Sequence, residues 1–387
     1  MRNKISTLLS VCLLYGLAEA ACAATGYQQQ NLVSDGFVPA AHIDPNLVNP
    51  WGLVFNPVGF SWVADNGSGL STLYDGNGVA QSLVVSVPGD DGPAAPTGIV
   101  FNGSNDFVVN DGAGGHSGPS AFIFASEDGT ISGWSPAVPP PAPSTAAQVA
   151  VPAAGGAVFK GLAIGTSAGS QFIYATDFHN NRIDVFNSSF APVVPSGSFS
   201  DPNLPAGFAP FGIQNIGNQL FVTYAKQDGA AHDDVPGAGN GFVDVYDLTG
   251  HLIQRLVSGG ALNSPWGLAM APSNFGQFSN DLLVGNFGDG TIHAYDPTTG
   301  TLLGTLSDQN GNPLVNDGLW ALQFGNGLFN QATNALFFTA GPDGEAHGLY
   351  GSLTAAPEPS TLVIAGLGAC LLVVARARGR FIRQGAH

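Results

Sequence analysis

A short apolar segment with a small residue at its centre recurs along the chain. Its clearest copies are Pro50–Leu53 and Pro265–Leu268, which share the sequence Pro-Trp-Gly-Leu. The weaker copies place their small residue at Gly98, Gly161, Gly212 and Ala321. Six copies separated by roughly 50 residues indicate an array of similar supersecondary units.

Each unit continues with short apolar runs of the kind that forms β-strands. In the unit that begins at Gly267, such runs occupy 281–286, 291–296 and 302–306, and the turn residues Asp296–Gly300 separate the last two. Runs bounded by Gly, Asp and Asn are typical of strands in hairpins. In the other five units the second strand is expected at 62–66, 107–111, 172–177, 220–224 and 335–339.

Six units of four strands predict an all-β, six-bladed β-propeller over residues 25–355. An open solenoid is the alternative, and it would need capping ends. The last unit has no obvious fourth strand, whereas Tyr27–Ser34 resembles the outer strands of the other units. We therefore expect Tyr27–Ser34 to pair with the last blade and close the ring, which would protect the sheet edges.

The composition supports this assignment. Glycine (54) and proline (27) are abundant, and only 10% of residues are charged, which is typical of many strands joined by tight turns.

Three insertions interrupt the units. The segments 112–120 and 226–241 are expected between second and third strands, and 136–152 is expected to be an extended surface loop.

The body of the chain is strongly acidic. Outside the two end segments it holds 4 basic and 25 acidic residues, and 4 − 25 gives a net charge of −21. This charge argues against nucleic acid as a partner. It could attract Ca²⁺, or it could simply solvate the surface. All three cysteines (Cys12, Cys22 and Cys370) lie in the end segments, so the body can form neither a disulfide nor a cysteine-based metal site.

Residues 1–24 have the pattern of a secretory signal peptide. Two basic residues precede the apolar run Ile5–Leu17, and small residues follow it. We expect signal peptidase to cut after Ala23 or Ala24. Lipidation at Cys22 is the less favoured alternative, because an acidic residue stands where an apolar one is expected.

Residues 356–387 contain Pro357, Glu358 and Pro359, then the apolar run Leu362–Ala375, then four arginines. Fourteen helical residues span about 21 Å, which is short for a bilayer. The arginines would place the C-terminus in the cytoplasm. The simplest interpretation is a transmembrane anchor helix.

The order of these parts resembles the PEP-CTERM sorting signal. This resemblance implies a Gram-negative host, an anchored precursor in the inner membrane, recognition and removal of the tail by an exosortase, and a cell-surface or extracellular destination. The segment Asp177–Phe186 is similar to NHL-type repeats, and residues 27–355 resemble an uncharacterised family of PEP-CTERM-associated propellers. This family implies a fold and a location but no reaction.

In a propeller, the loop before the first strand and the loop between the second and third strands share one face. The tryptophans expected on that face are Trp51, Trp266 and Trp320. The polar side chains expected there are Asp65, Asn66, Asn110, Asp111, Asp177, His179, Asn180, Asn286, Asp289 and Asp343. The candidate Ca²⁺ ligands among them are Asp65, Asp111, Asp177 and Asn286. The alternative is that these side chains complete turns and that the tryptophans are wedges between blades rather than a ligand platform.

The sequence names no reaction. It contains no HExxH zinc motif, no GxSxG nucleophile motif and no phosphate loop. His232–Asp234, in a glycine-rich loop, is a further candidate for a ligand contact. We expect an exported binding or structural module whose partner is extracellular polysaccharide or a matrix protein. The alternative is a calcium-dependent hydrolase, similar to the six-bladed lactonases. A quinone- or sugar-dependent dehydrogenase is a third class, for which no cofactor ligands are recognisable.

Overall fold

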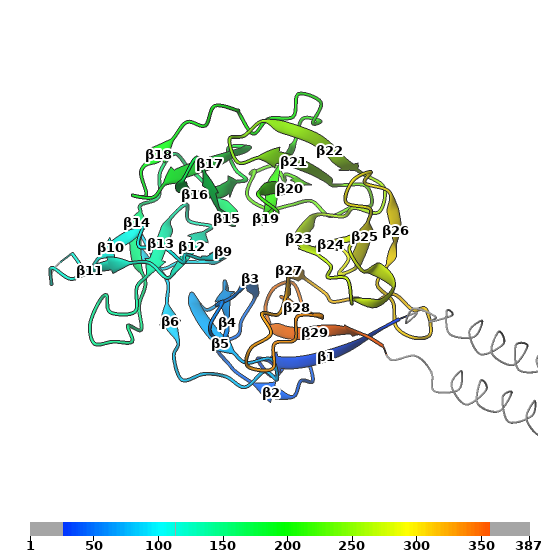
Figure 1. Cartoon of the computed structure of the whole chain (residues 1–387), viewed down its shortest axis with the longest axis horizontal. Helices are drawn as coiled ribbons and strands as arrows, with labels where there is room; N and C mark the ends of the chain where they lie inside the picture. The colour runs from blue at the N-terminus through cyan, green and yellow to red at the C-terminus, as the bar shows by residue number, and fades with distance from the viewer. Residues whose placement is uncertain (1–25, 113, 357–387) are drawn as a thin grey trace, which may run out of the picture.

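Six sheets, antiparallel except for one parallel edge pair in the last, surround a central axis in the computed structural model, which describes residues 26–112 and 114–356 (Figure 1). Blade 1 consists of β3 (Pro50–Phe55), β4 (Ser61–Asp65), β5 (Leu70–Tyr74) and β6 (Val85–Ser86). Blade 2 consists of β9 (Pro96–Phe101), β12 (Phe122–Ser126), β13 (Ile131–Trp134) and β14 (Gln148–Val151). Blade 3 consists of β15 (Phe159–Ser167), β16 (Ser170–Asp177), β17 (Arg182–Asn187) and β18 (Pro192–Val193). Blade 4 consists of β19 (Phe208–Ile216), β20 (Gln219–Lys226), β21 (Phe242–Asp247) and β22 (Leu252–Ser258).

The last two blades complete the ring. Blade 5 consists of β23 (Pro265–Met270), β24 (Leu282–Asn286), β25 (Ile292–Tyr295) and β26 (Leu302–Thr305). Blade 6 consists of β27 (Leu319–Phe324), β28 (Ala335–Ala340), β29 (Leu349–Ala355), β1 (Tyr27–Ser34) and β2 (His42–Ile43). The remaining elements are the two-residue strands β7 (Pro88–Gly89) and β8 (Gly92–Pro93), the hairpin β10 (Val108–Asn110) and β11 (Ser117–Pro119), and one 3₁₀ turn (Gly276–Phe278). The all-β, six-bladed prediction is confirmed.

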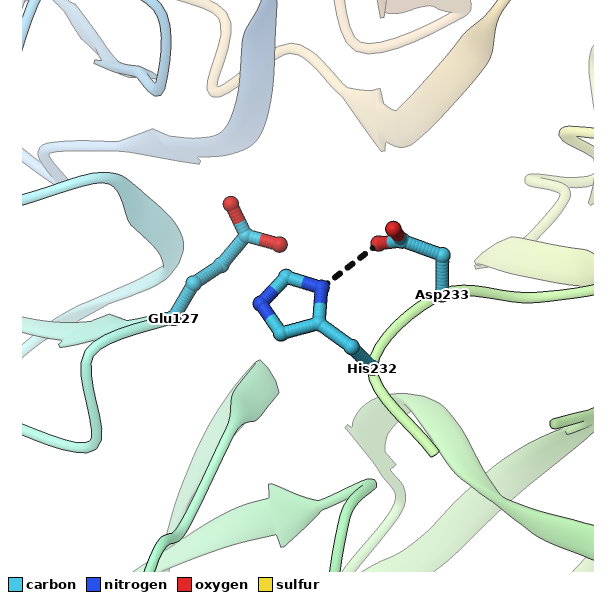
Figure 2. Close-up of side chains that lie close together, drawn as sticks. All are labelled: Glu127, His232 and Asp233. Carbon is cyan, nitrogen blue, oxygen red and sulfur yellow. Dashed lines mark hydrogen bonds and ion pairs between the residues drawn. The ribbon is translucent and has the colours of Figure 1, made fainter. Parts of the chain in front are cut away.

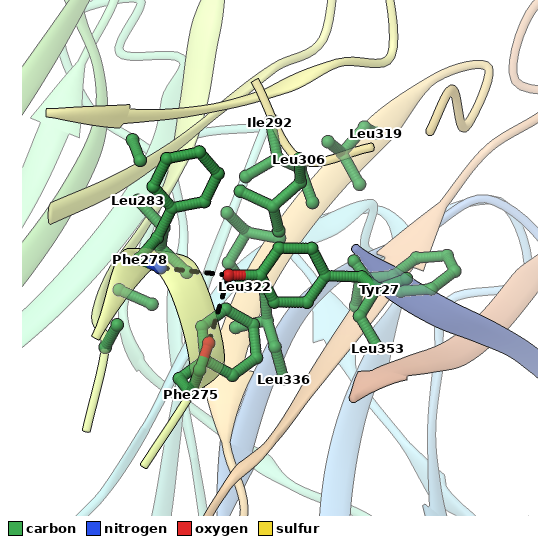
Figure 3. Close-up of a cluster of buried hydrophobic side chains, with 14 of the residues drawn as sticks. Tyr27, Phe275, Phe278, Leu283, Ile292, Leu306, Leu319, Leu322, Leu336 and Leu353 are labelled. Atoms are coloured by element: carbon green, nitrogen blue, oxygen red, sulfur yellow. Dashed lines mark hydrogen bonds between the residues drawn. The ribbon is translucent and has the colours of Figure 1, made fainter. Parts of the chain in front are cut away.

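Strand β1 lies antiparallel to β29 in blade 6, with Tyr27 opposite Ala355. The Tyr27 side chain continues into blade 5. Its hydroxyl donates a hydrogen bond to the carbonyl of Phe275 and accepts one from the N–H of Phe278, within a buried cluster between the two blades (Figure 3). The first strand of the domain therefore contacts both of the last blades.

The recurring small residue is explained by how closely the inner strands approach one another. A Cβ atom at Gly98 would lie 2.3 Å from the Leu162 nitrogen, and one at Gly212 would lie 2.1 Å from the Trp266 carbonyl oxygen. A side chain there would collide with the next blade. Threonine hydroxyls also link blades: Thr176 donates to the carbonyl of Phe211 at 2.8 Å.

Blade 2 differs from the sequence prediction. Its second strand is β12, whereas the predicted strand at 107–111 belongs to the β10–β11 hairpin outside the sheet. The apolar pattern misled because Phe107 packs on blade 3, with its ring 5.1 Å from that of Phe190 and its N–H bonded to the Ser188 carbonyl.

The three predicted insertions gave mixed results. The segment 112–120 spans the tip of the β10–β11 hairpin and β11 itself, so it does not join a second to a third strand. The segment 136–152 includes β14, the outer strand of blade 2, rather than only a surface loop. The segment 226–241 connects β20 with β21 as predicted.

The strand registers define two faces. Pro50 pairs with Asp65 at one end of blade 1, and Phe55 pairs with Ser61 at the other. We call the first end the mouth face, with the loops 66–69, 127–130, 178–181, 227–241, 287–291 and 341–348. We call the second end the far face, with the connections 56–60, 102–121, 168–169, 217–218, 271–281 and 325–334.

The predicted signal peptide, the motif Pro357-Glu358-Pro359 and the apolar run 362–375 lie outside the described residues. Within 26–112 and 114–356, no helix is long and apolar enough to cross a membrane.

Candidate site at the channel mouth

Three tryptophans fill the channel near the mouth face. The rings of Trp51 and Trp320 stack with their centroids 3.5 Å apart, and these residues are 2% and 1% exposed. Trp266 meets both rings edge-on. The indole N–H of Trp320 donates to Asn49, and that of Trp266 donates to the carbonyl of Lys160. The tryptophans gather on the expected face, and they pack mainly on one another.

A buried lysine lies beside these rings. Lys160, on β15, is 2% exposed, and its Nζ lies 5.2 Å from the centroid of the Trp51 ring. The ammonium contacts Glu127 Oε1 at 2.5 Å and Asp233 Oδ1 at 3.2 Å. Burial works to lower the pKa of Lys160, but the two carboxylates outweigh it and raise that pKa. The buried charge is stable only because it is paired.

His232 completes the mouth cluster, by which we mean Glu127, Lys160, His232 and Asp233. Its Nδ1 lies 2.9 Å from Asp233 Oδ1, and the ligand atoms of Glu127, His232 and Asp233 all lie within 4.8 Å of one another (Figure 2). Imidazole and carboxylates together can hold a transition metal. The Lys160 ammonium competes for both carboxylates, since it already occupies the space between them.

Amide side chains extend the cluster across the mouth. Asn66 donates to Glu127 Oε2 at 3.0 Å, and Asn49 donates to Asn66 at 3.2 Å and to Glu345 at 2.8 Å. Burial raises the pKa of Glu345. The network connects blades 6, 1 and 2, and Lys160 and Asp233 continue it to blades 3 and 4.

The predicted calcium ligands mostly serve their own blades. Asp177 accepts hydrogen bonds from the N–H groups of Val158 and Asn180, and Asn286 donates to the carbonyl of Ala261. Asp65 is fully buried, which raises its pKa. In the part of the chain that the structure describes, Glu127, His232 and Asp233 form the only trio of His, Cys, Asp or Glu ligand atoms within 4.8 Å. His179 is exposed on the mouth face.

Asn110 and Asp111 are not on the mouth face, so their placement there was wrong. They belong to the connection between β9 and β12, which joins these strands at the far face, and the hairpin lies at the periphery (Figure 1). Asp111 is paired there with His116, with Oδ2 and Nδ1 2.7 Å apart. The error follows from the misplaced second strand of blade 2.

Sequence reasoning missed Glu127 and Lys160. Glu127 follows β12, the strand that was not expected. Lys160 stands immediately before the small residue Gly161, where three other copies of the repeated segment have tryptophan. A single charged residue at a position otherwise held by aromatic or small polar residues was the available signal.

Two proteins of Acanthamoeba polyphaga mimivirus are similar to most of this chain. Uncharacterized protein R648 is 34% identical over 340 residues, which cover 86% of this chain and 81% of that protein. This chain belongs to its family. Uncharacterized protein L690, with 32% identity and 86% coverage of both chains, is a further member. No protein-family model matches the sequence.

A solved structure shares the fold of this chain. The streptogramin B lyase structure is 12% identical, with a TM-score of 0.50, and the match covers 86% of this chain and 99% of that one. Identity this low shows the six-bladed propeller fold alone. The names of the viral relatives state no activity, and the PEP-CTERM sorting signal stays a prediction.

Proposed function

We propose that this chain is an exported binding module that holds an extracellular polysaccharide or a matrix protein on its mouth face. One observation carries the proposal: the charged groups of the mouth are already paired with one another. The pKa of Lys160 is raised by its carboxylates. Burial would raise the pKa of Asp233, but Lys160 and His232 hold it below its usual value. An acid–base catalyst needs the opposite, a pKa moved toward neutrality. Burial does raise the pKa values of Glu345 and Asp234 in the mouth loops, but neither residue belongs to the mouth cluster.

The rim of the mouth offers hydrogen-bonding groups to a large partner. The side chains of His232 and Asp233 are 48% and 66% exposed, and exposed His179, Asp289 and Asp343 lie on the same face. Polar groups spread over several blades suit the hydroxyls of a glycan or the amides of a protein. The resemblance of the C-terminal segment to a sorting signal supports the exported location.

Capture by the full chain tests the proposal. Matrix polysaccharide and matrix protein from the native host would be incubated separately with the immobilised protein. We expect the double variant His232→Ala/Asp233→Asn to lower the affinity for one fraction about tenfold, which corresponds to about 1.4 kcal/mol.

A matched pair on the far face provides the control. His251 and Asp247 form an ion pair with side chains 59% and 43% exposed, so His251→Ala/Asp247→Asn removes the same groups away from the mouth. We expect this variant to bind like the wild type. Equal losses in the two variants, or no capture of either fraction by the wild type, would contradict the proposal.

The second candidate is a calcium-dependent hydrolase, favoured by the convergence of Glu127 and Asp233 at the mouth. Binding of Ca²⁺ there would have to displace the Lys160 ammonium. Calorimetry with Ca²⁺ and a panel of lactones separates the two functions. Calcium affinity with turnover would replace the binding function, whereas no heat and no turnover would remove the hydrolase.

A further inference from the structure

The two faces of the propeller differ in charge. In blades 1, 3, 4 and 6, the far-face connections 56–60, 168–169, 217–218 and 325–334 contain no Asp, Glu, Lys or Arg. The mouth loops of the same four blades contain or adjoin carboxylates, at Asp65, Asp177, Asp233 and Glu345. In a body with a net charge of −21, these four connections are therefore uncharged, and the acids of the same blades at this end are Asp75 and Asp247, beside the turns that follow the third strands β5 and β21.

Apolar side chains are exposed on that face where blade 6 meets blade 1. We call Val58, Val79, Leu328 and Phe329 the far-face patch, and they are 78%, 46%, 41% and 47% exposed. Val58 lies in the β3–β4 turn, Val79 in the turn after β5, and the other two between β27 and β28. Exposed apolar side chains that gather in one place are typical of an interaction surface.

The patch is built on a connected framework. Asn326 donates hydrogen bonds to the carbonyls of Asn56 and Gly59, and the carbonyl of Phe329 accepts one from Gly76. The Phe329 ring lies 4.4 Å from that of Phe60. Phe329 has a φ of +48°, a strained conformation for an aromatic residue. Strain of this kind persists only where the surroundings enforce it.

Both ends of the described chain lie at this face. Tyr27 pairs with Ala355, and Thr354 pairs with Ala335, the residue that follows the connection 325–334. The apolar run that begins at Leu362 starts six residues after Ala356. Since an extended chain spans at most about 3.5 Å per residue, the run begins within about 20 Å of this part of the far face.

We infer that the far-face patch rests on the lipid bilayer while the chain still carries its apolar run, with the mouth face turned away. Val, Leu and Phe side chains can enter the interfacial region, and the uncharged connections 56–60 and 325–334 do so without dehydrating a charge. The turn that carries Val79 also holds Asp75, whose carboxylate accepts the N–H groups of Asn77 and Val79. The acidic body favours zwitterionic over anionic lipid.

Fluorescence in brominated phosphatidylcholine vesicles tests this orientation in the full chain. The reporter is Phe329→Trp. The matched control is Phe37→Trp on the mouth face, because Phe37 is 52% exposed and its ring is stacked 4.0 Å from that of His347. The five native tryptophans are common to both variants. We expect brominated lipid to quench the added fluorescence of Phe329→Trp at least twofold and to leave that of Phe37→Trp unchanged.

Two further variants serve as checks on the quenching experiment. Adding Val58→Asp to the reporter should restore at least half of the lost fluorescence, and Leu328→Trp serves as a second reporter if Phe329→Trp does not fold. Equal quenching of the two faces, no quenching at either far-face reporter, or a dimer that covers the patch without quenching would overturn the inference. Ligand capture at the mouth is measured separately, so the two proposals can fail independently.

Discussion

Two basic side chains, the buried Lys160 and the partly buried Arg255, form similar clusters in different settings. Each cation contacts two carboxylates and lies close to an aromatic ring. The carboxylates beside Lys160 come from two loops of the mouth, and that of Asp233 is 66% exposed. This cluster is open to a ligand on one side.

Arg255 lies on β22 within blade 4, and its carboxylates are almost inaccessible: the side chains of Asp201 and Asp244 are 1% and 0% exposed. Burial and the nearby charge of Asp201 raise the pKa of Asp244 to about 7, against the opposing effect of Arg255. One proton is therefore held near neutral pH. The comparison teaches that the exposure of the carboxylates, rather than the residue types, separates a surface for a ligand from a structural cluster.

The largest expected effect comes from removing the cation at the mouth. Lys160→Met leaves Glu127 without its cation, and breaking a fully buried pair in this way costs about 3–5 kcal/mol. Because Glu127 still accepts a hydrogen bond from Asn66 and the 66% exposed Asp233 keeps His232, we expect a loss of about 2–3 kcal/mol. Urea denaturation of the full chain measures the loss. The exposed Lys226 provides the control, because Lys226→Met should change stability by less than about 0.5 kcal/mol.

A second substitution checks the cause. Adding Glu127→Gln to Lys160→Met removes one unpaired charge and should recover part of the lost stability. If the double variant is no more stable than the single one, the loss comes from packing around Trp51 rather than from charge.

The next effect is the pH dependence of the Arg255 cluster. Asp244 keeps its proton in the folded state up to about pH 7, whereas in the unfolded chain it releases the proton near the ordinary aspartate pKa of 3.8. Between these values the unfolded state binds fewer protons, so the free energy of unfolding falls as the pH rises, by at most about 1.4 kcal/mol per pH unit. Urea denaturation across this window measures the slope, and Asp244→Asn should remove this contribution.

For Asp233 we expect a pH dependence of stability with the opposite sign, which sharpens the comparison between the two clusters. Its pKa is lowered in the folded state, and its contribution to stability is therefore present at neutral pH and lost on acidification below its ordinary value. Asp233→Asn should weaken the acid-side loss and leave the slope assigned to Asp244. The same change of slope in both variants would contradict the distinction between the two clusters.

Much of the fold could be predicted because the repeated small residue has a single geometric cause. Gly98 and Gly212 each face the backbone of the next blade, so the sequence must repeat wherever inner strands meet. Blade 2 could not be predicted in the same way. Phe107 is apolar because of contacts with a neighbouring blade, and a one-dimensional pattern does not distinguish these contacts from those within a sheet.

The site was less predictable because it is assembled across blades. His232 and Asp233 were recognisable from their glycine-rich loop, but their partner Glu127 is 105 residues away in sequence (232 − 127) and follows a strand that was missed. Asp and Asn at strand ends were correctly suspected of completing turns, as Asp177 does. The local sequence pattern does not show which carboxylates pair with a buried lysine from another blade.

The smallest expected effect concerns Asp111, whose sequence setting resembles that of the mouth acids. Its carboxylate binds His116 and backbone N–H groups of the exposed β10–β11 hairpin, on the connection that joins strands at the far face. Asp111→Asn combined with Asn110→Ala should therefore change neither matrix capture nor urea denaturation measurably, while Asp233→Asn lowers capture. If the hairpin variant lost as much capture as Asp233→Asn, the ligand would have to contact the periphery of blade 2, and the binding surface would extend well beyond the mouth cluster.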